Sequence, residues 1–310
     1  MLRSLPFIAV VLLAFPGHGQ SKSNNSTSID PGGCVLDHIA VEPGIRQYQY
    51  DGLSFDGKRL AIGWERDEED RGTYILDLEN QERMNLSGMN NGAVFAPDGK
   101  TLVNSVYEES GKTDIVEYEL KTGKITTVAL HPDWDWLASY SSDGNTILFN
   151  SYRTGSSDIY TYNKQTQQLK RWTDFDGYDA HAQFSPDDSK ILFNRHEGGS
   201  DYNLYVIDTS DGQVSQLTED KTEEGYGSWS PDGKTIAFAS DRDKKPGTGD
   251  IYLMDADGSN IRQLTDMDTK DGYPFFSPDG RYLYFNSLRE AQGVYRITLD
   301  DELNCVKAKR

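Results

Sequence analysis

A short turn sequence, aromatic-Ser-Pro-Asp-Gly, recurs along this chain at nearly constant intervals. Clear copies begin at Phe95, Phe184, Trp229 and Phe276, and eroded copies are Leu53-Ser54-Phe55-Asp56-Gly57 and Tyr140-Ser141-Ser142-Asp143-Gly144. The turn aspartates of the six copies are Asp56, Asp98, Asp143, Asp187, Asp232 and Asp279. They lie 42 to 47 residues apart, which suits one four-stranded propeller blade of about 40 to 45 residues. Six copies therefore predict a six-bladed β-propeller.

Within each copy, short runs of alternating apolar residues predict the strands. In the fifth copy these runs are Tyr226–Trp229, Thr235–Ser240, Asp250–Met254 and Ile261–Thr265, each bounded by Gly, Asp or Pro. No long helical period interrupts the pattern. The fold class is therefore all-β, with four-stranded antiparallel blades.

The two ends of the chain are predicted to complete one blade together. The sixth copy supplies three strands between residues 273 and 299 but no fourth, while Leu36–Val41 is left over near the N-terminus. If Leu36–Val41 pairs antiparallel with Val294–Leu299, Cys34 and Cys305 come close enough for a disulfide that locks the ring. The alternative is that both thiols are free, which is uncommon in exported proteins because disulfides form in oxidising compartments.

The first residues have the order of a secretory signal. Arg3 precedes the apolar run Phe7–Phe15, and small residues follow up to Gly19. Nine residues are too few to span a bilayer. We therefore expect a signal peptide over residues 1–19, a flexible leader over 20–33, and a single propeller domain over 34–310. The protein is predicted to be periplasmic or secreted, without membrane insertion.

The chain is strongly acidic, with a formal net charge of −19. Such a charge repels polyanions, so nucleic acid is not an expected partner. Partners are expected to be neutral, cationic or locally complementary, although the acidity could equally serve solubility in salt. We expect a monomer.

Several repeated features resemble the TolB-like, or PD40, propeller repeats, a WD40-like group. These features are the turn itself, the Ser-x-Arg of Ser240-Asp241-Arg242, the Ile251-Tyr252 pair and the closing Leu264-Thr265. The resemblance covers about residues 36–300 and implies the fold more than the function, because the repeated residues build the blades. The family's namesake carries an additional N-terminal α/β domain, for which this chain has no room. The sequence also contains no Gly-x-Ser-x-Gly nucleophile elbow.

The face opposite the Pro-Asp-Gly turns is the predicted functional face. Eight residues before each turn aspartate stand Tyr48, Asn90, Asp135, Asp179, Glu224 and Asp271. Six residues before it stand Tyr50, Gly92, Leu137, His181, Tyr226 and Tyr273. These two rings predict an acidic and aromatic mouth. The candidate ligand-binding residues on this face are His131, Trp134, Trp136, His181, His196, Tyr226 and Tyr273. The alternative is that they cap the ends of the blade cores.

The fourth copy suggests a metal site. Folding its hairpin about the turn places His181 opposite Asn194 and Asp179 opposite His196. Asp179, His181 and His196 could then bind one zinc, manganese or nickel ion. A solvated histidine pair is the alternative, and apart from this possible divalent metal no cofactor is expected.

The segment from His181 to Gly198 is also similar to a stretch of the oligogalacturonate lyases, which are metal-dependent propeller enzymes. That resemblance implies His181 and His196 as candidates for base or metal ligand and Arg153 as the partner of a substrate carboxylate. Tyr226 is a further catalytic candidate on the same face. An acidic mouth argues against a polyuronate substrate. Two other copies also place an arginine in the Arg153 slot, which gives this residue a structural explanation.

The predicted function is a non-catalytic one. A rigid propeller would present its histidine- and tryptophan-bearing face to a protein, peptide or glycan of the cell envelope. The alternative is an enzyme, a lyase or hydrolase acting on oligosaccharides with His181 as acid or base.

Overall fold

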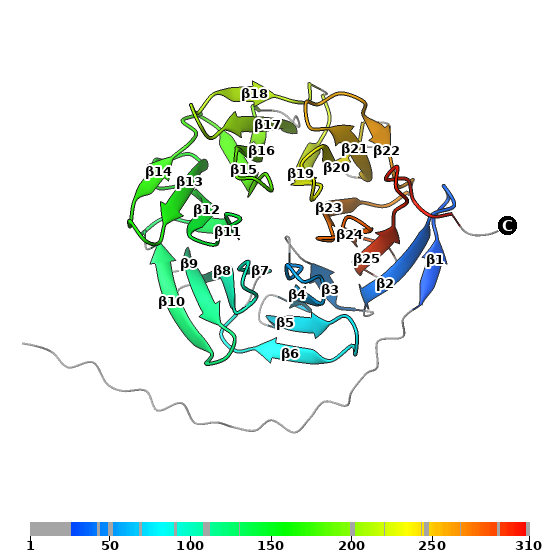
Figure 1. Ribbon diagram of the computed structural model, residues 1–310, viewed down its shortest axis with the longest axis horizontal. Helices are drawn as coiled ribbons and strands as arrows, with labels where there is room; N and C mark the ends of the chain where they lie inside the picture. The colour runs from blue at the N-terminus through cyan, green and yellow to red at the C-terminus, as the bar shows by residue number, and fades with distance from the viewer. Residues whose placement is uncertain are drawn as a thin grey trace, which may run out of the picture.

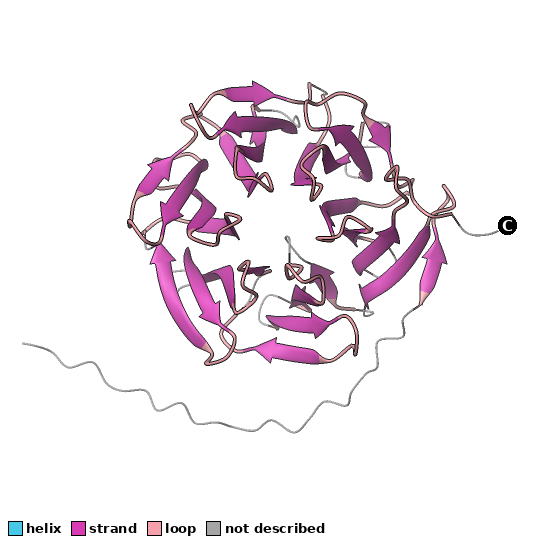
Figure 2. Ribbon diagram, in the orientation of Figure 1, coloured by secondary structure: helices cyan, strands magenta, loops and turns pink. Residues whose placement is uncertain are grey.

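Six antiparallel sheets stand around a central axis and close into a ring in the computed structural model (Figure 1). The structure describes residues 26–41, 44–48, 52–67, 70–89, 92–107, 112–129, 131–198, 202–219, 221–242, 244, 248–266, 268–289 and 292–307. These residues form strands, turns and loops without a helix (Figure 2), so no helix in the described ranges could cross a membrane. The predicted six-bladed, all-β fold is confirmed.

Each of the first five blades consists of four consecutive strands, ordered from the axis outward. The first two blades are β3 (Arg46–Tyr48), β4 (Arg59–Glu65), β5 (Arg71–Asp77), β6 (Arg83–Leu86), and β7 (Val94–Phe95), β8 (Thr101–Tyr107), β9 (Thr113–Glu119), β10 (Lys124–Ala129). The next two are β11 (Asp135–Tyr140), β12 (Thr146–Ser151), β13 (Asp158–Asn163), β14 (Leu169–Arg171), and β15 (Tyr178–Phe184), β16 (Lys190–His196), β17 (Tyr202–Asp208), β18 (Val214–Gln216). The fifth blade is β19 (Glu224–Trp229), β20 (Thr235–Ser240), β21 (Asp250–Asp255), β22 (Arg262–Gln263).

The sixth blade joins the two ends of the chain, as predicted. Its C-terminal strands are β23 (Asp271–Phe276), β24 (Tyr282–Ser287) and β25 (Gly293–Thr298), and its N-terminal strands are β2 (Val35–Val41) and β1 (Thr27–Ile29). Strand β2 pairs antiparallel with β25, with Leu36 opposite Ile297. Strand β1 is a fifth, unpredicted strand that pairs with β2. Residues 26–33 of the predicted leader are among the described residues and include β1, whereas the predicted signal peptide lies outside the described residues.

The disulfide that we predicted closes this blade. Cys34 and Cys305 are bonded, their Cα atoms lie 5.5 Å apart, and they are separated by 271 residues of chain. Both are buried, in the hydrophobic cluster between the fifth and sixth blades. The ring is therefore held by hydrogen bonds between β2 and β25 and by a covalent link beside them.

The hydrophobic core lies between neighbouring blades. The middle strands of a blade are covered on both faces, so their residues are apolar without alternation, as in β12 and β20. One fully buried phenylalanine recurs at the same place in the second strand of four blades: Phe149, Phe193, Phe238 and Phe285. Packing between blades makes the ring rigid and leaves the residues at its two mouths available for other roles.

A β-bulge interrupts the first strand of the third, fourth, fifth and sixth blades. In each bulge one residue other than glycine has a positive φ: Leu137, His181, Tyr226 and Tyr273. In the fourth blade the predicted register holds between the turn and the Gln183–Leu192 pair. Beyond the bulge it is wrong: Asp179 lies opposite Arg195, and His196 lies opposite Tyr178. The bulge adds one residue to β15, which shifts every later pair.

Candidate functional site

Two cavities lie on the propeller axis. The first, on the face opposite the Pro-Asp-Gly turns, has a volume of about 270 Å³ and is called the central cavity below. The second, on the turn face, has a volume of about 320 Å³ and is lined by Pro186, Pro231 and Pro278 among others. Val94, Ser139 and Gln183 line both cavities and therefore lie between them.

The central cavity is aromatic and carries no charge. None of the described residues that line it is Asp, Glu, Lys or Arg. Its aromatic residues are Tyr107, Trp134, Trp136, Tyr178, Tyr226 and Tyr273. Its polar residues are Asn104, Ser105, Thr113, Ser139, His181 and Gln183. The predicted aromatic mouth is therefore present, but its innermost part is neutral.

The bulges bring three side chains from neighbouring blades together at the axis. The ring of His181 lies 4.7 Å from that of Tyr226 and 5.8 Å from that of Tyr273, and the two tyrosine rings are 4.0 Å apart. The Tyr226 hydroxyl also hydrogen-bonds to Glu223 at 3.3 Å. The same repeat position in the third blade, Leu137, lines the cavity as well. The same bulge position of four consecutive blades thus contributes to the lining.

His181 is held neutral by its surroundings. Burial lowers the pKa of His181 to about 4. Its Nδ1 atom is buried and has no hydrogen-bond partner among the described residues, so charging the ring inside the fold would be costly. At neutral pH the cavity therefore presents an uncharged imidazole.

This shift makes stability depend on pH. The unfolded chain protonates His181 below its ordinary pKa of 6.5, whereas the folded chain does so only near 4. Between these values the unfolded state binds more protons, so the free energy of unfolding falls as the pH decreases, by up to about 3 kcal/mol. Denaturant unfolding should be measured at about pH 7.5 and about pH 4.5. Between these two pH values, the free energy of unfolding should decrease less for His181→Asn than for the wild type. Equal losses in the two proteins would contradict this assignment.

A row of aromatic rings lies along the central cavity over the second, third and fourth blades. We call this row, formed by Tyr107, Trp134, Trp136, Tyr178 and Tyr202, the aromatic arc. Successive ring centroids lie 6.1 to 6.4 Å apart along it. Tyr152 adds a branch, 5.3 Å from Trp136. Three blades thus contribute to one continuous aromatic surface.

The predicted acidic mouth is wrong, because its acids are buried and paired. Asp135, Asp179, Glu224 and Asp271 have no exposed side-chain surface. Each binds an arginine from the second strand of its blade or the residues just after it, and these arginines are Arg153, Arg195, Arg242 and Arg289. Burial nevertheless raises the pKa of Asp135, Asp179 and Asp271, the last to about 6. These pairs neutralise the carboxylates behind the cavity wall.

Arg153 therefore has a structural partner. Its guanidinium lies 2.9 and 3.1 Å from the two carboxylate oxygens of Asp135, and its Nε donates to Ser151 at 2.7 Å. It also lies over the ring of Tyr160. The structure thus supports the structural explanation that the repeated arginine slot suggested.

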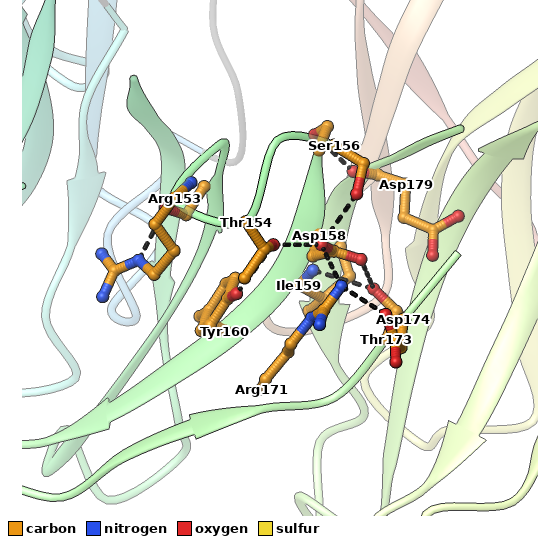
Figure 3. Close-up of polar contacts among 12 residues, drawn as sticks. Arg153, Thr154, Ser156, Asp158, Ile159, Tyr160, Arg171, Thr173, Asp174 and Asp179 are labelled. Carbon is orange, nitrogen blue, oxygen red and sulfur yellow. Dashed lines mark hydrogen bonds and ion pairs between the residues drawn. The ribbon is translucent and has the colours of Figure 1, made fainter. Parts of the chain in front are cut away.

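A neighbouring acid, Asp158 at the start of β13, is likewise engaged in the blade (Figure 3). It accepts hydrogen bonds from Thr154 at 2.8 Å, Ser156 at 3.2 Å and Thr173 at 3.3 Å, and it pairs with Arg171 at 2.8 Å. Figure 3 shows these groups converging on one carboxylate. They tie the third strand of the blade to the fourth.

The three predicted metal ligands do not gather around one point. Asp179 is held by two hydrogen bonds of 2.8 Å from Arg195, and the ring of His196 stacks on Tyr202 at 4.4 Å. His181 points to the tyrosines at the axis. Within the described ranges no group of three or more His, Cys, Asp or Glu side chains could hold a metal ion. The bulge in β15 is the reason, because it breaks the register on which the predicted cluster depended.

The remaining predicted residues divide between the cavity and its surroundings. Trp134, Trp136, Tyr226 and Tyr273 line the central cavity. His131 lies outside it, where its Nδ1 accepts a hydrogen bond of 3.2 Å from the backbone N–H of Asp133.

Sequence reasoning missed Tyr107, Tyr178 and Gln183. The repeat contained a signal for one of them: Tyr178 stands nine residues before its turn aspartate, the position that Trp134 occupies in the preceding copy. Counting one residue further back in each copy would have found it. Tyr107, at the end of a second strand, offered no such signal.

Comparisons with known proteins identify the repeat. A family model described as "TolB beta propeller domain" (PD40) matches residues 52–201 and 163–248, overlapping segments that together span more than half of the chain. The crystal structure of TolB from Acinetobacter baumannii is similar at a TM-score of 0.66 and 22% identity. The match covers 81% of this chain and 65% of that one, so this chain spans less than two thirds of its length.

Two further solved structures show the same architecture. A putative TolB from Agrobacterium tumefaciens has a TM-score of 0.62 at 21% identity, with 81% of this chain and 90% of that chain covered. An oligogalacturonate lyase from Vibrio parahaemolyticus has a TM-score of 0.60 at 14% identity, with 90% and 97% covered. At such low identities the likeness shows the fold alone.

Proposed function

The chain belongs to the PD40 family of TolB β-propeller domains, and on that premise we propose that it is a binding protein whose ligand occupies the central cavity. The observation that carries this proposal is an aromatic cavity without a charged side chain among its described lining residues, in a chain of net charge −19. Such a cavity favours an uncharged ligand. A charged ligand would lose its hydration on entering, and no charged side chain of the described lining would compensate that cost.

The state of the polar groups supports binding over catalysis. The carboxylates behind the cavity wall are paired with arginines, as for Asp179 and Arg195. His181 is neutral and can offer a hydrogen bond, but its Nδ1 has no carboxylate partner among the described residues that would orient the ring as a general base. What remains at the surface of the cavity is ring faces, amides and hydroxyls. These groups are suited to holding a ligand by packing and hydrogen bonds.

The lyase alternative receives less support. A uronic-acid substrate needs a cation for its carboxylate, and Arg153, the residue considered for that role, is bound to Asp135. The central cavity supplies no other cation from the described residues.

The proposal places the protein outside the cytoplasm, in the periplasm or the medium, as a scaffold for an envelope ligand. The bond between Cys34 and Cys305 is compatible with that location, because disulfides persist in oxidising compartments.

Intrinsic fluorescence tests the proposal, since Trp134 and Trp136 line the cavity. Titration with neutral oligosaccharides and neutral peptides should reveal a ligand that changes this emission. Its affinity should stay constant within about twofold between about 50 mM and about 500 mM salt, because no ion pair forms. Tyr226→Ala should weaken binding about tenfold. Phe55→Ala, at the mouth of the opposite cavity, is the matched control and should not.

Two outcomes would contradict the proposal. One is that oligogalacturonate binds and its affinity falls steeply with salt. The other is that neutral ligands bind equally well to Tyr226→Ala and to the wild type.

A further inference from the structure

The central cavity is the middle one of three adjoining hollows. On one side, a hollow of about 550 Å³ shares Trp134 and Trp136 with it and is also lined by Tyr152. On the other side, a hollow of about 300 Å³ shares Tyr178, His181 and Tyr226 with it. Aromatic walls thus divide one extended surface into three neighbouring compartments.

In the two outer hollows, the charged residues that the structure describes pair with oppositely charged neighbours. Lys112 and Asp133, which line the larger one, form an ion pair of 2.7 Å. Glu223, which lines the smaller one, pairs with Lys270 at 2.7 Å. Across all three hollows the surface therefore offers rings and balanced charges, and it favours an elongated ligand without net charge.

The polar lining distinguishes between two kinds of neutral elongated ligand. The amide of Gln183 and the ring of His181, whose Nδ1 has no hydrogen-bond partner among the described residues, lie in this lining, and together they can both donate and accept hydrogen bonds. A polyhydroxylated ligand needs both functions. A proline-rich segment, which also docks on aromatic grooves, offers carbonyl acceptors but lacks most of the N–H donors of other peptides.

We propose that the ligand is a neutral oligosaccharide of several pyranose units that lies along the aromatic arc and extends into the outer hollows. This inference rests on the proposed function and names its ligand class. One face of a pyranose is formed largely by C–H groups, which pack on aromatic rings, while the equatorial hydroxyls reach sideways to amides and hydroxyls. Tyr107, which is 39% exposed and stands at one end of the arc, provides an accessible ring for such packing.

Calorimetric titration of the purified protein tests this inference. The probes are cellohexaose, maltohexaose, xylohexaose and chitohexaose, the corresponding disaccharides, and a decaproline peptide. At least one hexasaccharide should bind, and about tenfold or more tighter than its disaccharide, because only the longer chain spans neighbouring hollows. Trp136→Ala, which removes the wall between two hollows, should weaken that binding about tenfold or more. Trp172→Ala, on the outer side of the same blade, is the matched control and should leave it unchanged.

The possible failures separate the two proposals. If no neutral hexasaccharide binds while decaproline binds and is lost in Trp136→Ala, the oligosaccharide is wrong but a neutral ligand in the central cavity stands. If a disaccharide binds as tightly as its hexasaccharide, the extended arc is wrong. If oligosaccharides bind and Trp136→Ala and Tyr226→Ala both bind like the wild type, the location is wrong and both proposals fail.

Discussion

Replacing both Cys34 and Cys305 by serine is expected to lower the melting temperature by about 10 °C or more. The disulfide joins two residues that are 271 positions apart in the sequence. The chain-entropy model gives about 5 kcal/mol of stabilisation for a loop of this length. For a domain of this size each kcal/mol corresponds to about 2–4 °C. The measurement is thermal unfolding of the wild type, the wild type with reductant, and the double serine variant.

The variant should still fold, because the closing strands keep their other contacts. Leu36 and Ile297 remain fully buried in register, and Arg296 pairs with Asp37 at 2.6 Å. Reductant should destabilise the wild type but leave the serine variant unchanged. A difference of less than about 3 °C between the two proteins would show that strand pairing alone holds the ring closed.

Removing Arg195 should cost about 3–5 kcal/mol of stability, because Asp179 then stays buried without a partner. Arg195→Met keeps most of the volume and removes the charge. Urea unfolding near neutral pH is the measurement. The deficit should shrink at about pH 4, because the pKa of Asp179 is already raised by burial and the lone carboxyl can then accept a proton.

A double-mutant cycle separates the energy of the ion pair between Asp179 and Arg195 from the other contributions of Arg195 to stability. Asp179→Asn combined with Arg195→Met should cost less than Arg195→Met alone, since no charge is left buried. Lys234→Met, whose partner Asp232 is exposed, is a control expected to change stability by less than about 1 kcal/mol. If the double variant loses as much stability as Arg195→Met alone, Arg195 acts through packing on Phe175 and Tyr205 rather than through its charge.

The repeat was sufficient to predict the architecture from local information. A turn such as Ser230-Pro231-Asp232-Gly233 is stabilised by its own residues: the Ser230 hydroxyl donates to Asp232, and the Gly233 N–H donates to the Ser230 carbonyl. The backbone bond recurs in all six copies, and the hydroxyl bond recurs in all but the second, where Ala96 replaces the serine. The blade count therefore follows from the period. The missing fourth strand and the two cysteines were enough to predict the closure.

The strand register near the axis could not be predicted from these local patterns. His181, Tyr226 and Tyr273 have positive φ values although they are not glycines, and no local rule predicts a bulge at such residues. The acids were placed on the correct face. Their burial, however, depends on arginines such as Arg153 and Arg289, whose partners lie about eighteen residues away on a neighbouring strand.

By itself, the amino-acid sequence determined the number of blades, the face on which the aromatic residues gather and the bond that joins the ends. Each of these follows from short-range patterns repeated along the chain. Only the tertiary structure decided that the acids of the mouth are paired with arginines, that Asp179 and His196 contact different partners, and that Tyr107, Trp136 and Tyr178 line one cavity. The physical reason is that these features depend on bulges and on contacts between different blades, which a linear period does not specify.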